Sequence, residues 1–442
     1  MNRIILIGNG FDKAHDMPTS YNDFINAYYK GFCEKASEQQ RYYKNEDLEM
    51  SVDTQTIAHV FGGRKVNSID EFYSYCKSYN QLQKSNYPPN KVDVNFYNKF
   101  LEHITLEVKS SDWVDVENEF YLHLIEAAKT EINHTHITKM PEYIDVNTLN
   151  QNLDSISKIL EKYLDSVEKK HLSNPYIQQI QNAIYSKFNY RDISLSFIDV
   201  FLEEVKSKME YLKDKNTDLN SQRMITEYSQ LYPSLSFNTK VISVFSEQNS
   251  LLNYNKESLN QEFKNGFLSD YFMVPENILF LTFNYTHTEQ KYVISSPLVD
   301  VIHIHGEIDN KENPIIFGYG DELEKNYKTI ENLNDNRFLK NMKSTHYFRT
   351  ENYRKLLSFI ESQPYQIFIM GHSCGNSDRT LLNTLFEHKN CASIKPFFHQ
   401  IDENKDNYNE IIQNISRNFN DKIMMRDRVV NKTFCEPLVK II

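Results

Sequence analysis

Glycine is rare in this chain and unevenly placed, and this constrains the fold more than any other feature of the sequence. The 442 residues include 11 glycines, well below the average usage of about 7%. Residues 64–265 contain none, whereas seven glycines end short apolar runs elsewhere: Gly8, Gly10, Gly306, Gly318, Gly320, Gly371 and Gly375. This distribution predicts one part built from strands and turns and another built from helices.

The glycine-containing parts hold short runs rich in Ile, Val, Leu and Phe, namely Arg3–Ile7, Ile278–Phe283, Val301–Ile304, Pro314–Phe317, Gln366–Met370 and Ile394–Phe398. Near-continuous apolar runs of this length are typical of buried parallel strands. Helix-like segments follow at Asp378–Glu387 and Tyr408–Arg417, which indicates alternating strands and helices. We therefore expect an α/β fold of the Rossmann-like kind, with a parallel sheet formed by both chain ends.

The remaining part shows helical spacing of apolar residues. Two such faces are Leu153, Ile156, Leu160, Tyr163, Leu164 and Val167, and Phe197, Val200, Phe201, Val205, Met209 and Leu212. Connections between helices are expected at Pro88-Pro89, Pro141, Pro175 and Pro233. The predicted domains are a core of residues 1–25 plus 276–442 and an α-helical insertion of residues 26–275.

Charge and composition exclude several classes of protein. The formal net charge is −11 and no segment carries a basic run, so nucleic acid is not expected as a partner. No apolar stretch approaches the roughly 18 residues of a membrane span, and the apolar run at residues 4–7 is too short for a secretion signal. The five cysteines form no CxxC pair, which favours reduced thiols in the cytoplasm over a structural zinc site.

The first predicted strand leads directly into Gly8-Asn9-Gly10-Phe11-Asp12 and a helix-like segment. A glycine turn in this position allows backbone N–H groups and a helix N-terminus to approach a pyrophosphate. We expect these five residues to bind a nucleotide, with Asp12 reaching a ribose hydroxyl or capping the helix. The alternative is an ordinary tight turn, because the third glycine of the usual dinucleotide motif is missing.

Two later strands end in polar residues. Asn284 follows Ile278–Phe283 and could hold a ribose or a water, or cap a helix. His303 and His305 alternate along the next strand and are expected on one face of it. Such a pair can chelate a metal, but no further cluster of ligands is obvious nearby, so no metal is expected. His305, beside Gly306, is the better candidate for a general base.

Gly371-His372-Ser373-Cys374-Gly375 follows a predicted strand and matches the G-x-S-x-G nucleophile elbow of serine hydrolases. Asp378, Asp402 and His399 are available as further members of a triad. That hypothesis leaves the first glycine turn and Asn284 without a role. The alternative is a second glycine turn in which Gly371 and Ser373 contact the same nucleotide.

Taken in order, several of these segments resemble a degenerate sirtuin core. They are Gly8-Asn9-Gly10 with Met17-Pro18-Thr19, Phe283-Asn284-Tyr285-Thr286, Ile304-His305-Gly306, Pro314-Ile315-Ile316-Phe317-Gly318 with Asp321-Glu322, and Gly371-His372-Ser373. The chain departs from sirtuins in two respects. The zinc module is absent, and Thr286 stands where sirtuins carry an Asp.

The chain also resembles the AbiH family of bacterial phage abortive-infection proteins. The residues that carry this resemblance are Ile7-Gly8-Asn9-Gly10-Phe11-Asp12, Pro18-Thr19-Ser20-Tyr21, Trp113-Val114-Asp115-Val116-Glu117, His303-Ile304-His305-Gly306, Phe317-Gly318-Tyr319-Gly320-Asp321 and Gly371-His372-Ser373. The resemblance implies anti-phage defence and a sirtuin-like fold. The acids around Trp113 are explained as well by helix initiation, with Trp113 in the core.

By analogy with sirtuin-like domains, Asn284 would position the nicotinamide ribose or a water and His305 would act as the base. Gly8, Asn9 and Gly10 would hold the pyrophosphate of NAD, and Ser373 would contact a ribose. The leading hypothesis is an NAD-hydrolysing defence effector with a phage-derived trigger protein, acting as a homo-oligomer. The alternatives are a non-catalytic sensor of NAD or ADP-ribose and a hydrolase that uses Ser373.

Overall fold

The structure, a computed structural model, describes residues 1–38, 42–44, 50–53, 71–72, 74–75, 78, 94–106, 113–133, 145–214, 228–232 and 255–440. The chain forms two compact units. Unit 1 comprises Met1–Asp16, His171–Pro314 and Tyr347–Ile442, and unit 2 comprises Met17–Lys170 and Ile315–His346. Each unit is described by itself below.

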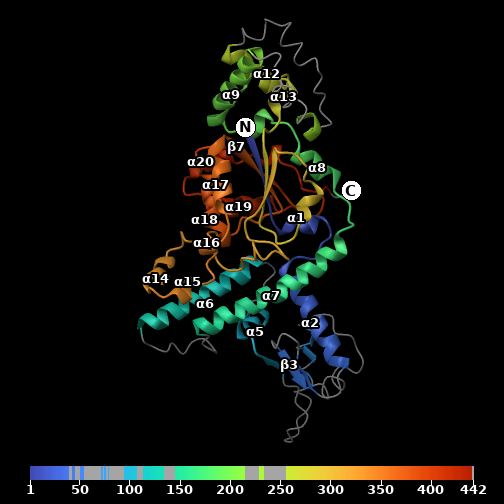
Figure 1. Ribbon diagram of the computed structural model, residues 1–442, viewed down its shortest axis with the longest axis vertical. Coiled ribbons are helices and arrows are strands. Elements are labelled where there is room, and N and C mark those ends of the chain that lie inside the picture. Colours follow the sequence, from blue (N-terminus) through green and yellow to red (C-terminus); the bar gives the residue numbers. More distant parts are fainter. Residues whose placement is uncertain are drawn as a thin grey trace, which may run out of the picture. The chain divides into compact units, whose positions relative to one another are not determined.

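Unit 1 is built on a five-stranded sheet in which every strand pair is parallel (Figure 1). Its strands are β1 (Asn2–Ile7), β5 (Ile278–Thr282), β6 (Val299–His303), β7 (Tyr365–Met370) and β8 (Cys391–Phe397). They are ordered β6-β5-β1-β7-β8, with β1 at the centre. A mixed α/β fold with a parallel sheet is therefore confirmed.

The near-continuous apolar runs become strands because both faces of the sheet are covered. Every residue of β1, β5 and β7 is buried. Ile5 and Ile7 share a core cluster with residues of α1 (Asn9–Ala14) and α8 (Gln178–Ile184). Since side chains alternate along a strand, the intervening Ile4 and Leu6 face the other side, where Figure 1 shows α17 (Asn352–Ser362) and α18 (Arg379–Phe386).

The other helices of unit 1 are α9 (Leu195–Asp214), α12 (Lys256–Asn265), α13 (Asp270–Met273), α19 (Tyr408–Asn418) and α20 (Lys422–Arg428). Short 3₁₀ helices lie at Tyr190–Asp192, Thr288–Lys291, Asn376–Asp378 and Lys432–Phe434. The predicted helices at 378–387 and 408–417 are confirmed as α18 and α19. Along α9 the buried face includes Ile198 and Leu202, whereas Val200 is exposed, so the predicted face is rotated slightly.

One predicted strand is wrong. Pro314–Phe317 is apolar and short, but these residues form no strand. Ile316 and Phe317 are buried by loop packing instead, and the ring of Phe317 meets Trp113 edge-on at 5.7 Å. Proline donates no backbone hydrogen bond, which already weakens a strand assignment at this position.

Unit 2 is mainly helical. Its helices are α2 (Tyr21–Glu38), α5 (Lys99–Leu106), α6 (Trp113–Asn133), α14 (Tyr327–Asn332), α15 (Asn336–Leu339) and α16 (Lys343–His346), together with most of α7 (Val146–His171). A small antiparallel sheet contains β2 (Tyr42–Lys44), β3 (Met50–Asp53) and β4 (Val94–Phe96). The predicted helical face at 153–167 lies within α7.

The boundaries of the compact units differ from the predicted domain ends at residues 25 and 275. The division into a core and a helical insertion stays a prediction. Pro175 lies between α7 and α8 as expected, while Pro88-Pro89, Pro141 and Pro233 fall outside the described residues. Within the described part of the chain, no helix has the length and apolar character needed to cross a bilayer.

Candidate functional site

The register of the sheet brings the predicted site segments to one edge. Ile7 pairs with Thr282 on one side and Met370 on the other, and Thr282 in turn pairs with His303. Because these strands are parallel, the residues that follow them leave the sheet at the same carboxyl edge. Gly8, Asn284, His305 and Gly371 therefore belong to adjacent loops, although they are far apart in the sequence.

Two of these loops interlock through glycines. A Cβ atom at Gly8 would lie 2.6 Å from the Cα of His372, and one at Gly10 would lie 2.8 Å from the carbonyl oxygen of Gly371. Gly371 itself has a φ of 78° and leaves no room for a side chain against Phe11. Close packing of backbone against backbone thus requires glycine at these positions.

The same packing uses the backbone donors of the predicted phosphate loop. The amide of Gly10 donates to the carbonyl of Gly371 at 2.8 Å, that of Phe11 to Gly8 at 2.8 Å, and that of Gly8 to Met370 at 3.3 Å. These bonds, together with the close backbone packing, explain why glycine occupies these positions even in the absence of a ligand. Phosphate binding by Gly8, Asn9 and Gly10 stays a prediction. Because the amides of Gly8, Gly10 and Phe11 already donate within the protein, a bound phosphate would need other donors.

Asp12, on α1, is a buried carboxylic acid at the carboxyl edge of the sheet. Its side chain is 1% exposed, and the hydroxyl of Thr286 donates to Oδ2 at 2.6 Å. Burial raises the pKa of Asp12 to about 6, although the hydrogen bond from Thr286 acts in the opposite direction. Among the described residues, Oδ1 of Asp12 has no hydrogen-bond partner, so this oxygen can accept a hydrogen bond from a ligand.

Asn284 ties two of the loops together. Its Nδ2 donates to the carbonyl of Gly8 at 3.1 Å, and its backbone amide donates to the hydroxyl of Thr282 at 3.1 Å. The side chain is buried beside the first glycine turn. Asn284 therefore holds the loop after β1 in place, rather than capping a helix.

His305 and His372 share one carboxylate. Asp378 lies with Oδ1 3.3 Å from Nε2 of His305 and with Oδ2 3.5 Å from Nε2 of His372. The hydroxyl of Tyr347 also lies 3.2 Å from Nε2 of His305. All three titratable side chains are buried, and the ring of Phe283 packs edge-on against both imidazoles. A histidine paired with a buried carboxylate in this way can act as a general base.

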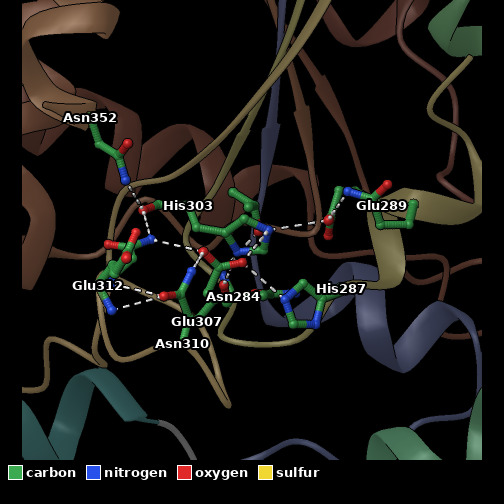
Figure 2. A network of polar contacts seen from close by, with 11 residues as sticks. Asn284, His287, Glu289, His303, Glu307, Asn310, Glu312 and Asn352 are labelled. Carbon is green, nitrogen blue, oxygen red and sulfur yellow. Dashed lines mark hydrogen bonds and ion pairs between the residues drawn. The ribbon is translucent and has the colours of Figure 1, made fainter. Parts of the chain in front are cut away.

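His303 and His305 do not share a site, which corrects the expectation from their alternation. Strand β6 ends at His303, and Ile304 and His305 form a turn. His303 instead contacts the backbone carbonyl of Asn284 through Nδ1, at 3.3 Å, and Glu289 through Nε2, at 3.2 Å. Figure 2 shows this second group of polar residues, which also includes His287 and Glu307.

Ser373 is exposed, and Asn414 donates to its backbone carbonyl at 2.8 Å. Among the described residues its hydroxyl forms no hydrogen bond with a histidine. In this turn the residues with a left-handed backbone are Gly371 and Cys374, with φ of 78° and 56°, rather than the serine. His399 and Asp402 are exposed, and Asp378 is engaged with His305 and His372. The geometry of a nucleophile elbow with its triad is therefore not assembled here.

The Trp113 segment lies in unit 2 and begins α6, as helix initiation predicts. The indole of Trp113 donates to the carbonyl of Thr19 at 3.0 Å and packs against Tyr21 and Phe24. Glu117 forms a buried ion pair with Lys343 at 2.8 Å. These contacts account for the segment through packing within unit 2.

Sequence reasoning missed several members of the two groups. Tyr347 carries no motif and could not be found from the sequence. Glu307 follows His303 by four residues, and His287 and Glu289 lie just beyond Asn284, so a search for histidine and carboxylate side chains near both strand ends could have found them. A separate group of possible ligands, His103, Glu119 and His123, lies on α5 and α6 in unit 2.

Comparison with known proteins yields one finding. The family model described as "Bacteriophage abortive infection AbiH" matches residues 194–400, a little under half of the chain. This range contains β5 to β8, Asn284, both strand-end histidines and Ser373, and it excludes the first glycine turn and Trp113. The match supports the resemblance to the AbiH family. No curated protein matches the chain, and no solved structure does.

Proposed function

We propose that this AbiH-like chain is an abortive-infection effector that binds NAD at the carboxyl edge of its sheet and hydrolyses the bond between nicotinamide and ribose. The observation that carries the proposal is the buried pair of His305 and Asp378, 3.3 Å apart, in segments that leave the same edge of the sheet as those with Asn284 and Asp12. The family match supports the role in phage defence. The proposed reaction is inferred from the side chains at the carboxyl edge of the sheet.

The strand order supports nucleotide binding. Taken in chain order, the strands are arranged 3-2-1-4-5, so the direction of winding reverses between β1 and β7. In open α/β sheets, ligands bind outside the carboxyl ends of the strands at such a reversal, as in Rossmann-like folds. The segments that follow β1 and β7 carry the residues predicted to contact NAD, Gly8–Asp12 after β1 and Gly371 and Ser373 after β7.

The proposed reaction transfers the ribosyl carbon from nicotinamide to water. The oxygen of water bonds to C1′, the C1′–N bond breaks, and its electron pair neutralises the pyridinium nitrogen of nicotinamide. His305 accepts the proton of the water, and the carboxylate of Asp378 stabilises the imidazolium that forms. ADP-ribose, nicotinamide and one proton are the products.

Other residues would bind and orient the substrate. The unpartnered Oδ1 of Asp12 is an acceptor for a ribose hydroxyl, and Asn284 would orient the ribose or the attacking water. Because the amides of Gly8, Gly10 and Phe11 donate within the protein, we assign contacts with the pyrophosphate to the side chains of Asn9 and Ser373.

The test measures release of nicotinamide from NAD by the purified full chain, alone and with lysate from phage-infected cells. His305→Gln should lower the rate by about 10² to 10⁴, the usual contribution of a general base. His388→Gln is the matched control, because His388 also pairs with a carboxylate, that of Glu361 at 3.2 Å, but lies away from this edge. Turnover that survives both His305→Gln and Asn284→Ala would contradict the mechanism.

Calorimetry separates hydrolysis from sensing. A non-catalytic sensor of NAD or ADP-ribose would show a stable stoichiometric complex and no continuing heat of reaction. An effector that hydrolyses NAD would show continuing heat under the conditions that activate it. The same titration with Asp12→Asn should weaken binding of the ribose, whichever of the two roles applies.

A further inference from the structure

The second polar group at the sheet edge has the composition of a metal site. His287, His303 and Glu307 each present one ligand atom, and these three atoms lie within 4.8 Å of one another (Figure 2). We propose that they bind a divalent transition-metal ion, with Zn²⁺ as the probe. Two imidazoles and one carboxylate are a ligand set that leaves a coordination position open. This proposal does not depend on the hydrolysis of NAD.

The distances between the donor atoms fit a common metal. Oε2 of Glu307 lies 3.0 Å from Nε2 of His287 and 3.9 Å from Nε2 of His303. Tetrahedral zinc with bonds of about 2.0–2.2 Å separates its ligand atoms by about 3.4 Å. These two distances fall on both sides of that value, each within about half an ångström of it.

Hydrogen bonds outside the group already orient its ligands. The backbone carbonyl of Asn284 lies 3.3 Å from Nδ1 of His303; when Nδ1 carries the proton, Nε2 presents a lone pair to the group. Oε1 of Glu307 accepts from Nδ2 of Asn310 at 2.8 Å and from Nδ2 of Asn313 at 3.2 Å, which turns Oε2 toward His287. Metal-binding histidines and carboxylates are usually held in this way.

Charge also favours a cation. Glu289 is 1% exposed, and its Oε1 lies 3.2 Å from Nε2 of His303. Together with Glu307 it brings two carboxylates to a partly buried group. A divalent cation would balance both charges while the histidines stay neutral. Glu289 would then accept a hydrogen bond from a water in the open coordination position.

The competing explanation is two ordinary histidine–carboxylate pairs, His287 with Glu307 and His303 with Glu289, which need no metal. The two explanations differ in metal content. The full chain is therefore treated with a chelator, dialysed and titrated with Zn²⁺, with binding followed by calorimetry and bound metal by mass spectrometry. All proteins carry His103→Gln, because the group on α5 and α6 also offers three ligand atoms.

In that background we expect one Zn²⁺ per chain. His287→Ala and Glu307→Gln should each weaken binding at least 100-fold, and Asn310→Ala should weaken it about 10-fold to 100-fold through the orientation of Glu307. His388→Ala, which breaks a histidine–glutamate pair outside this group, should leave the affinity unchanged. Circular dichroism checks that each variant is folded, and Asn310→Ala tests the site with every ligand still present.

Replacement of zinc by Co²⁺ gives a second readout, because the visible absorption of the ion reports its ligands and should change in His287→Ala. The proposal is overturned if the starting protein retains no zinc and gives no heat on titration. It is also overturned if His287→Ala, Glu307→Gln and Asn310→Ala all bind zinc as the starting protein does.

Discussion

Asp12 places a titratable carboxyl group where water does not reach it. Burial raises the pKa of this group to about 6 from 3.8. Because the folded-state pKa lies above that of the unfolded chain, the folded protein binds the proton more tightly than the unfolded chain does. The contribution of Asp12 to stability is therefore fully present below about pH 4 and is lost as the pH rises to about 6, a loss of about 3 kcal/mol.

Asp12→Asn should remove this dependence on pH. The amide oxygen can still accept from Thr286, but the side chain no longer titrates. We expect the free energy of unfolding in urea to fall less between about pH 4 and 6 in the variant than in the wild type, by up to about 3 kcal/mol. Asp300→Asn, at an exposed position on β6, is the control. An equal fall in wild type and Asp12→Asn would show that Asp12 is not the source.

At the scale of elements, the loops after β1 and β7 act as one interlocked structure. Gly8 and Gly10 on one loop meet Gly371 and His372 on the other, with no space between the two backbones for a Cβ atom. The positions of Asn284 and His372 depend on this contact, because Asn284 donates to Gly8 and His372 lies against it. A change in the glycines should therefore disturb both the stability and the site.

Gly8→Ala should destabilise the protein by about 1–3 kcal/mol, the usual cost of forcing an extra group into a packed region. Gly31→Ala is the control, because Gly31 lies within α2 and its Cβ would meet nothing within 4 Å. That change should stabilise the protein by about 0.5–1 kcal/mol, since alanine favours a helix over glycine. Thermal unfolding measures both, and similar effects of the two changes would argue against interlocked loops.

At the scale of the whole molecule, unit 1 is assembled from three separate stretches of chain, and Arg3 joins all of them. Its guanidinium, fully buried on β1, donates to the carbonyls of Ile184 and Ser186 and to Oε1 of Gln366. It also lies 4.2 Å from the ring centre of Phe368. Burial lowers the pKa of Arg3 to about 10, so the charge persists near neutral pH.

Arg3→Met keeps much of the side-chain volume but removes the guanidinium donor from two carbonyls, of which that of Ile184 is buried and that of Ser186 partly buried. Each unsatisfied group costs about 1–3 kcal/mol, and we expect a loss of about 2–4 kcal/mol in the free energy of unfolding. Far-ultraviolet circular dichroism in urea measures the loss, while Trp113, the only tryptophan of the chain, reports on unit 2. Arg191→Met, at an exposed position, should cost less than about 1 kcal/mol. Equal losses in the two variants would contradict the role of Arg3.

Local sequence patterns are enough to identify the five strands of the large sheet. Runs such as Arg3–Ile7 and Gln366–Met370 are apolar at nearly every position, and only a strand covered on both faces buries all of them. The helices at Arg379–Phe386 and Tyr408–Asn418 were equally visible, because their apolar spacing is a local property. The strand predicted at Pro314–Phe317 was wrong, because a short apolar run can also be buried in a loop.

Which side chains meet depends on tertiary packing. His303 and His305 are two residues apart, yet the end of β6 between them sends one to Glu289 and the other to Asp378. Asp378 lies 73 residues from His305 in the sequence and reaches it because β6 and β7, which precede the two residues, belong to the same sheet and end at the same edge. Helices and strands follow from neighbouring residues, whereas a site depends on how distant segments pack, and no local pattern contains that information.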